Sequence, residues 1–335
     1  MRPAPPSQTK LLICVWHWFT LWRPPADLAA HIRKTWPEMK VVHLPNFDHY
    51  EKELPDTDIL VGWALRPEQW RLARKLKWIH STAAGVGQLM FRELRESAVI
   101  LTNASGVHTV PLAEHVVGML IALARRFPAA WRYQAQGRWA QQEIWDEALR
   151  PRELQGQTLL LVGFGAIGRE VARRVRPLGM RIVAVTRTGQ GDAELAGRFL
   201  PASRLDEVLP EADYVVLAAP ETPETHHLIG ARQLAAMKPT AYLINVARGT
   251  LVDEAALIET LQRRAIAGAA LDVTEREPLP PDSPLWKLDN VLITPHISAV
   301  SEHLWDRQTE LILDNLERWF AGKELRNRVD LKRGY

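Results

Sequence analysis

Three residues in the second half of the 335-residue chain have side chains suited to carbonyl chemistry, and each lies close behind an apolar run: Arg248, Glu277 and His296. Histidine can give or take a proton near neutral pH, and a carboxylate bonded to its second nitrogen fixes the ring and favours the imidazolium. Arginine keeps its charge and can bridge a carboxylate and a neighbouring carbonyl oxygen. Together these residue types suit the reduction of a carbonyl beside a carboxylate, or the reverse oxidation.

A glycine-rich segment predicts where the hydride carrier binds. The apolar run 159–162 leads into a G-x-G-x-x-G motif, and a helical pattern follows. In this context the first glycine allows a tight turn, the second lets the backbone approach a pyrophosphate, and the third lets helix and strand pack closely. The N–H groups at the start of the helix favour phosphate. The predicted dinucleotide-binding residues are Gly163, Gly165, Ala166, Ile167 and Gly168.

The end of the next predicted strand favours NADP(H) over NAD(H). An NAD-binding enzyme usually has an acidic residue here, which bonds the ribose 2′-hydroxyl. This chain has Thr186, Arg187 and Thr188 instead, and its next acid is Asp192, beyond a predicted turn. A guanidinium and two hydroxyls suit a 2′-phosphate. The alternative is NAD, with Arg187 as an ordinary solvated loop residue.

Each candidate catalytic residue also has a purely structural interpretation. A histidine after proline is often structural, Arg248 could cap a helix, and Glu277 could be a surface acid. Asp272, at the end of a predicted strand, could be a turn former. The catalytic interpretation is favoured because these residues recur at strand ends after a nucleotide-binding motif, where open α/β sheets bind their ligands.

Strand and helix patterns alternate along almost the whole chain. Helical patterns such as 25–36 and 67–76 separate short apolar runs, which predicts α/β architecture with parallel sheets. The two longest helical stretches are 112–136 and 302–320. The predicted strands are residues 11–16, 40–44, 59–63, 78–81, 99–103, 158–162, 181–185, 214–218, 241–246, 268–272 and 291–294.

The two long helices lie on either side of the nucleotide-binding segment, which suggests that the chain passes twice between two domains. We expect a substrate (catalytic) domain in residues 1–104, completed by 297–335, and an NAD(P)-binding domain in residues 105–296. The predicted fold class is α/β, with two Rossmann-like, doubly wound parallel-sheet domains.

Composition argues against several other classes of protein. The formal net charge of +3 is too small, and too evenly spread, for a nucleic-acid-binding surface. The chain contains no run of 18 apolar residues, so no membrane span is expected. A single cysteine, Cys14, excludes an internal disulfide and fits a reducing compartment. We therefore expect a cytoplasmic protein that binds neither nucleic acid nor membranes.

Three motifs resemble those of the D-2-hydroxyacid dehydrogenase family, which includes glyoxylate/hydroxypyruvate reductases and phosphoglycerate dehydrogenases. They are N-x-x-R-G from Asn245, L-D-V-x-x-x-E-P-L-P from Leu271 and T-P-H-I from Thr294. Segments 83–87, 103–107 and 113–115 also follow the family's order, so the resemblance covers nearly the whole chain.

The resemblance implies a nucleotide domain inserted into a flavodoxin-like substrate domain, and it implies catalytic roles for Arg248, Glu277 and His296. It also implies that Asp272 contacts the nicotinamide carboxamide and that Ala247 borders the cofactor. Backbone N–H groups are expected to hold the substrate carboxylate, and they belong to Ala84, Gly85 and Val86.

The expected substrate is a small 2-oxo or 2-hydroxy acid. A phosphorylated substrate would need several converging cations, and only Arg66 stands out after the third predicted strand. Glyoxylate or hydroxypyruvate is therefore favoured, with a phosphoglycerate dehydrogenase-like enzyme as the alternative.

Aromatic residues gather near the end of the helical stretch 112–136, as in many interface cores, although a domain core explains them equally well. The resemblance implies a homodimer built by this region, with Trp139 able to reach the neighbouring active site. The aromatic residues are Trp131, Tyr133, Trp139 and Trp145.

Two other kinds of relative share the fold. Formate dehydrogenases pair their histidine with Gln, whereas this chain has Glu277. Dinucleotide-sensing corepressors bind protein partners, and the lack of long disordered tails here weakens that alternative.

Overall fold

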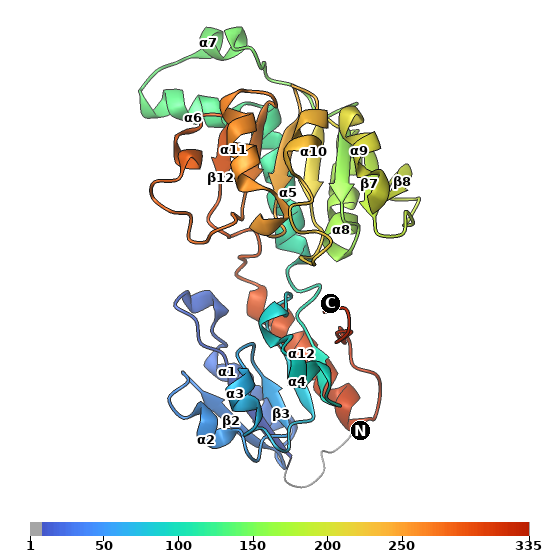
Figure 1. The fold of residues 1–335 in the computed structure, drawn as a ribbon. Coiled ribbons are helices and arrows are strands. Elements are labelled where there is room, and N and C mark those ends of the chain that lie inside the picture. Colours follow the sequence, from blue (N-terminus) through green and yellow to red (C-terminus); the bar gives the residue numbers. More distant parts are fainter. Residues whose placement is uncertain (1–8, 335) are drawn as a thin grey trace. The chain divides into compact units, whose positions relative to one another are not determined.

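The computed structural model describes residues 9–334, which belong to two compact units (Figure 1). Of the described residues, 9–108 and 300–334 make up unit 1, and unit 2 is Thr109–Ala299. The chain therefore passes between the units after residues 108 and 299, a few residues beyond the boundaries expected after residues 104 and 296.

Unit 1 contains a five-stranded sheet in the order β2-β1-β3-β4-β5, with every pairing parallel. Both β2 and β3 pair with β1, so the winding reverses there, as in flavodoxin-like folds. The strands are β1 (Lys10–Cys14), β2 (Lys40–Leu44), β3 (Ile59–Val61), β4 (Trp78–His80) and β5 (Ile100–Thr102).

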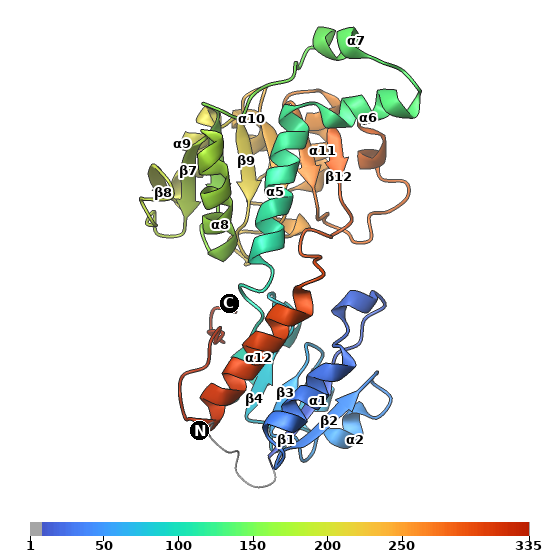
Figure 2. The same cartoon turned by 180° about the vertical axis from the view of Figure 1, so that it is seen from behind.

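Helices cover both faces of the unit 1 sheet, which explains why most residues of its strands are apolar. On one face α1 and α12 pack against Leu11, Ile13 and Trp78 (Figure 2). The opposite face carries Leu12, Cys14 and further apolar residues under the short helices. The helices are α1 (Ala26–Thr35), α2 (Tyr50–Glu53), α3 (Pro67–Trp70), α4 (Arg92–Arg95) and α12 (Leu304–Phe320).

Unit 2 contains a seven-stranded parallel sheet in the order β12-β11-β10-β9-β6-β7-β8. Strand β8 was not predicted, because only Leu200 among its four residues is buried and the strand ends in proline. The strands are β6 (Thr158–Val162), β7 (Arg181–Thr186), β8 (Arg198–Pro201), β9 (Tyr214–Leu217), β10 (Tyr242–Asn245), β11 (Gly268–Leu271) and β12 (Val291–Ile293).

The unit 2 sheet is also covered on both faces. Helices α5 and α8 pack on one face (Figure 2), and α9, α10 and α11 pack on the other (Figure 1). The predicted fold class, two doubly wound α/β units with parallel sheets, is confirmed. The helices are α5 (Thr109–Ala124), α6 (Phe127–Ala135), α7 (Gln141–Asp146), α8 (Ala166–Val175), α9 (Leu205–Val208), α10 (Ala231–Ala236) and α11 (Glu254–Gln262).

The helical stretch predicted at 112–136 is two helices, so that prediction was wrong. Helix α5 ends at Ala124, and Arg126 has a left-handed backbone with φ of 59°. Pro128 stands in the first turn of α6, a position that proline tolerates because no backbone donor is needed there. Helices α6 and α7 form an arm that follows α5 after two residues, and extended chain leads from α7 back to the rest of unit 2 (Figure 1).

Within residues 9–334, none of the helices combines the length and the apolar character needed to cross a bilayer.

Candidate active site

The candidate residues of unit 2 follow the carboxyl ends of its strands. The glycine motif follows β6, Arg248 follows β10, Asp272 and Glu277 follow β11, and His296 follows β12. Parallel strands end at one edge of their sheet, so the strand order brings these loops to the same edge.

The glycine motif has the shape that a bound pyrophosphate requires. A Cβ on Gly163 would lie 2.6 Å from the Ala218 backbone, and one on Gly168 would lie 2.3 Å from the Gly163 carbonyl oxygen. A Cβ on Gly165, by contrast, would meet nothing within 4 Å. Gly165 precedes the ten-residue helix α8, whose first turn has no side-chain cap. The first and third glycines are thus needed for packing, while the second leaves open space beside the helix N-terminus, where a dinucleotide phosphate fits.

The turn after β7 contains the residues predicted to contact the adenosine ribose of the cofactor. The Thr186 hydroxyl donates to the Gln190 carbonyl oxygen and accepts from the Gln190 N–H, both at 3.1 Å. Gly189 has φ of 73° and packs against Pro201. Arg187 and Thr188 are exposed on this turn, so their side chains can be reached from solvent.

Asn245 shapes the segment that presents Arg248. Its side-chain oxygen accepts from the Ala247 N–H at 3.0 Å, and its side-chain nitrogen donates to the Arg248 carbonyl oxygen at 2.9 Å. The exposed guanidinium of Arg248 donates to the Ala247 carbonyl oxygen at 2.6 Å. Sequence analysis placed Asn245 at the start of the N-x-x-R-G motif but gave it no function, although asparagine is a common turn former.

Gly249 brings the Arg248 loop against the loop that carries Glu277. A Cβ at this position would lie 2.0 Å from the backbone of Thr274, so only glycine fits. The N-x-x-R-G motif therefore combines a turn former, a cation and a close backbone contact between neighbouring loops.

Glu277 and His296 form a direct pair. Glu277 Oε2 lies 2.6 Å from His296 Nδ1, while Oε1 accepts from the Thr274 N–H at 3.2 Å. The two side chains are 37% and 45% exposed, so the pair can still be reached by a small molecule. Because Nδ1 faces the carboxylate, Nε2 is the nitrogen oriented for other partners.

The pairing changes the pKa of both groups. The hydrogen bond to Glu277 raises the pKa of His296, against the opposing effects of burial and the Arg248 charge. Burial by itself would raise the pKa of Glu277, but the hydrogen bond and charge of His296 outweigh it, so the pKa of this carboxyl falls. The pair therefore favours an imidazolium next to a carboxylate.

Asp272 holds the loop that carries His296. Its buried carboxylate accepts from the Ile297 N–H at 2.9 Å, the Ser298 N–H at 3.0 Å and the Thr294 hydroxyl at 2.6 Å. Its carbonyl oxygen accepts from the His296 N–H at 2.8 Å. Sequence analysis missed this function because the partners lie more than twenty residues away. The predicted contact between Asp272 and the nicotinamide stays a prediction.

The turn expected to hold the substrate carboxylate belongs to unit 1. Ala84 and Gly85 are exposed and Val86 is buried, in the turn that follows β4. The Asn103 side chain donates to the Ala84 carbonyl oxygen at 2.8 Å, and the Ala104 N–H donates to the Ala83 carbonyl oxygen at 3.2 Å. These hydrogen bonds from the segment after β5 hold the turn in place.

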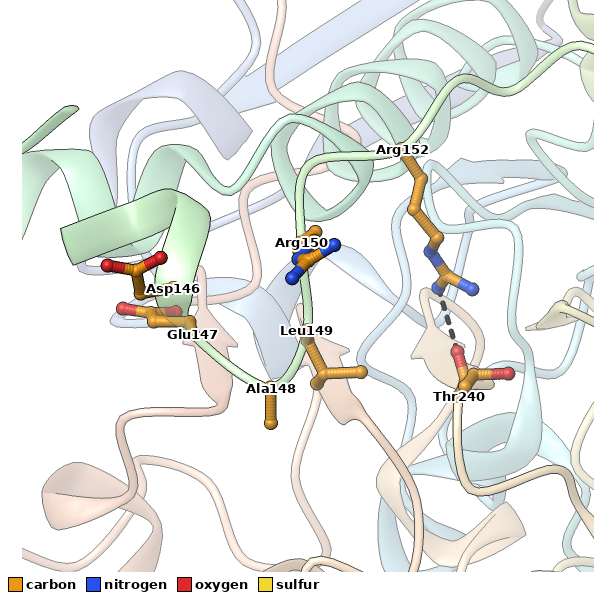
Figure 3. Close-up of a pocket in the computed structure, with 7 residues that line it drawn as sticks. All are labelled: Asp146, Glu147, Ala148, Leu149, Arg150, Arg152 and Thr240. Carbon is orange, nitrogen blue, oxygen red and sulfur yellow. Dashed lines mark hydrogen bonds between the residues drawn. The ribbon is translucent and has the colours of Figure 1, made fainter. Parts of the chain in front are cut away.

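Figure 3 shows a pocket of unit 2 that is lined by none of the candidate residues of that unit. It is lined by Arg152 and Thr240, which are joined by a 2.7 Å hydrogen bond, together with residues 146–150. Thr240 lies just before β10, whereas Arg248 follows the other end of that strand. This pocket is thus at the opposite end of the strand from the candidate active site.

Comparisons with known proteins identify the family. The family described as "D-isomer specific 2-hydroxyacid dehydrogenase, NAD binding domain" matches residues 117–298. A glyoxylate reductase of Korarchaeum cryptofilum is 37% identical over 278 residues, covering 81% of this chain and 82% of that protein.

Solved structures agree with this result. A D-isomer specific 2-hydroxyacid dehydrogenase from Xanthobacter autotrophicus Py2, in complex with NADPH and MES, is 30% identical with a TM-score of 0.83, and the match covers 100% of both chains. An NADPH-dependent glyoxylate/hydroxypyruvate reductase from Sinorhizobium meliloti, in complex with NADP and sulfate, is 25% identical with a TM-score of 0.81, covering 98% of this chain and 100% of that one.

The chain therefore belongs to the D-2-hydroxyacid dehydrogenase family, as its motifs predicted. It is an oxidoreductase that acts on CH–OH donors, with an NAD-binding domain in unit 2.

The Glu277→Gln variant tests the electrostatics of the pair. Removing the carboxylate should lower the pKa of His296, because burial and the Arg248 charge then act without the main opposing contribution. The measurement is an NMR titration of the His296 ring in both proteins. Glu275→Gln is the matched control, since Glu275 contacts His227 instead. If the His296 titration is unchanged in Glu277→Gln, Glu277 does not raise the pKa of His296.

Proposed function

We propose that the enzyme reduces small 2-oxo acids, such as glyoxylate and hydroxypyruvate, and that it prefers NADPH. The observation that carries this proposal is the 2.6 Å pair of His296 and Glu277, whose pKa values are shifted by each other and by Arg248. An imidazolium, its orienting carboxylate and a fixed cation are the groups that such a reduction needs.

His296 is the proton donor in this proposal. Nε2–H of the imidazolium donates to the substrate carbonyl oxygen, and the proton transfers as the carbonyl carbon receives the hydride that bound NADPH supplies. Glu277 fixes the ring through Nδ1 and stabilises its charge. In the oxidation direction the neutral imidazole takes the proton back.

Arg248 and the turn at Ala84–Val86 are proposed to hold the substrate. The guanidinium would bind the carboxylate and polarise the neighbouring carbonyl, since arginine presents a planar set of donors with a permanent charge. The backbone N–H groups of Ala84, Gly85 and Val86 would bind the remaining carboxylate oxygens.

The preference for an unphosphorylated substrate is supported by Arg66. Its side chain is 74% exposed, and its guanidinium lies 3.9 Å from the carboxylate of Glu68, with which it forms an ion pair. A phosphate group would need several cations converging on it. Small acids such as glyoxylate and hydroxypyruvate make no such demand.

The preference for NADPH is supported by the turn after β7. Arg187 and Thr188 are both exposed there, and no acidic residue occupies positions 186–191. The related structures from Xanthobacter autotrophicus and Sinorhizobium meliloti contain NADPH and NADP respectively. Arg187 would bond the 2′-phosphate through charge-assisted hydrogen bonds.

Replacing His296 with Ala should lower kcat for glyoxylate or hydroxypyruvate by at least about 100-fold, because the proton donor is lost. NADPH affinity, measured by fluorescence titration, should stay nearly unchanged. His303→Ala is the control, since His303 is an exposed histidine paired with Asp306. Wild-type enzyme that oxidises NADPH with no small 2-oxo acid would overturn the proposed function.

Replacing Arg187 with Ala should lower kcat/KM for NADPH by about tenfold and leave the value for NADH unchanged, since NADH lacks the 2′-phosphate that this guanidinium is proposed to bond. Steady-state kinetics with each cofactor checks this, and Arg263→Ala, an exposed arginine at the end of α11, serves as control. Equal rates of the wild type with NADH and NADPH count against the preference.

We also propose that the enzyme is a homodimer whose interface includes the arm of α6 and α7. Trp139 is 92% exposed, and Trp131 and Trp145 are about half exposed, on or beside these two helices. Large aromatic side chains are enriched in interface cores and are unfavourable in water.

A variant carrying Trp131→Ala and Trp139→Ala should shift from dimer to monomer, because both substitutions remove apolar area from the proposed interface. Sedimentation velocity at micromolar concentration measures the mass. Trp18→Ala is the control, because Trp18 is 74% exposed but belongs to unit 1. A monomeric wild type at this concentration rules the dimer out.

A further inference from the structure

His115 is a part-buried histidine of helix α5 that the chemistry above leaves without a function. Its side chain is 19% exposed, and Nε2 lies 3.0 Å from the Thr294 hydroxyl and 3.8 Å from Asp272 Oδ1. The segment 113–115 fits the family pattern, but that resemblance gives the residue no role of its own.

The direction of the hydrogen bonds follows from counting protons. The Thr294 hydroxyl has one hydrogen, and it donates that hydrogen to the Asp272 carboxylate at 2.6 Å. Toward His115 the hydroxyl oxygen is therefore an acceptor, so His115 carries its proton on Nε2. Burial lowers the pKa of His115, and the charge of Asp272 opposes this only in part. A neutral His115 ring with its proton on Nε2 can therefore donate to Thr294, which in turn donates to Asp272.

The hydrogen bonds from His115 through Thr294 and Asp272 lead to the loop that carries His296. Asp272 accepts from Thr294, Ile297 and Ser298 through its carboxylate, and from His296 through its carbonyl oxygen. His296 itself has φ of 53°, a left-handed backbone that a residue with a side chain rarely adopts. The bonds to Asp272 hold the loop in this conformation.

The network also joins two distant parts of unit 2. His115 lies six residues after Thr109, where the chain enters the unit, and segment 294–298 lies just before Ala299, where the chain leaves it. Within unit 2, the hydrogen bond between His115 and Thr294 is thus a direct link between the entering helix and the loop that carries His296.

We infer that His115 is a positioning residue: through Thr294 and Asp272 it holds the His296 loop so that the imidazole stays in place to protonate the substrate. This inference rests on the proposed function, since it assigns the proton transfer to His296. Groups that contribute no catalytic atom but fix one that does often have sizeable effects on rate.

The test compares substitutions at both ends of the hydrogen bond. His115→Leu removes the donor with similar bulk, and Thr294→Val removes the hydroxyl with nearly unchanged shape. Each should lower kcat about tenfold while KM for NADPH stays near its wild-type value. The double variant should be no worse than Thr294→Val alone, because that substitution already removes the bond to His115 together with the bond to Asp272. Thr294→Ser, which keeps the hydroxyl, should restore most of kcat.

Glu114→Gln is the matched control on the same helix turn. Glu114 is exposed and contacts Arg174, so this variant should keep wild-type kcat. If His115→Leu fails to fold, Thr294→Val and Thr294→Ser carry the test alone. Wild-type kcat in a folded Thr294→Val variant overturns the inference. So does a double variant whose loss of kcat equals the product of the losses in the two single variants.

A second readout separates this inference from the proposed function. In the Thr294→Val protein, the NMR titration of the His296 ring should change, because the loop no longer fixes its distances to Glu277, Arg248 and Asp272. This measurement needs no substrate. A changed titration in an enzyme that reduces no 2-oxo acid supports the positioning and rejects the proposed reaction, whereas an unchanged titration rejects the positioning.

Discussion

The buried carboxylate of Asp272 has to be satisfied from within the protein, because a buried charge without partners is strongly destabilising. The groups that satisfy it are the Thr294 hydroxyl and the N–H groups of Ile297 and Ser298. These residues surround His296, so satisfying the charge also sets the path of the loop. The side chain of His296 then meets Glu277 from the preceding loop. The position of His296 thus depends on Asp272, which sequence analysis interpreted as a cofactor contact or, alternatively, a turn former.

A second constraint comes from the parallel sheet of unit 2. Its strands end at one edge, so residues far apart in the sequence become neighbours there without any long connection. Gly163 packs against the end of β9, and Gly249 packs against the loop after β11. These close backbone contacts align the glycine turn, Arg248 and the pair of Glu277 and His296 along one edge. A side chain at either glycine would push neighbouring loops apart.

Much of this arrangement could be predicted from the sequence, because the information is local. Apolar runs such as Thr158–Val162 mark buried strands, and the spacing of Gly163, Gly165 and Gly168 follows from the shape of the turn. Strand ends placed Arg248, Glu277 and His296 at one edge once a parallel sheet was assumed. The break at Arg126 was missed although Pro128, in the first turn of the second helix, is a local signal for a helix boundary. Strand β8 was missed because an edge strand buries few residues. The network of His115, Thr294 and Asp272 could not be predicted, since its members are separated by up to 179 residues and no spacing rule connects them.

The central claim is that the imidazole of His296 and the guanidinium of Arg248 meet the substrate in front of a bound nicotinamide. The most direct measurement is a crystal structure of the enzyme with NADP⁺ and oxalate, an unreactive dicarboxylate that resembles glyoxylate. We predict hydrogen bonds from His296 Nε2 and Arg248 to oxalate, with the anion against the C4 position of the nicotinamide. Well-defined oxalate bound without contact to either side chain would contradict the account.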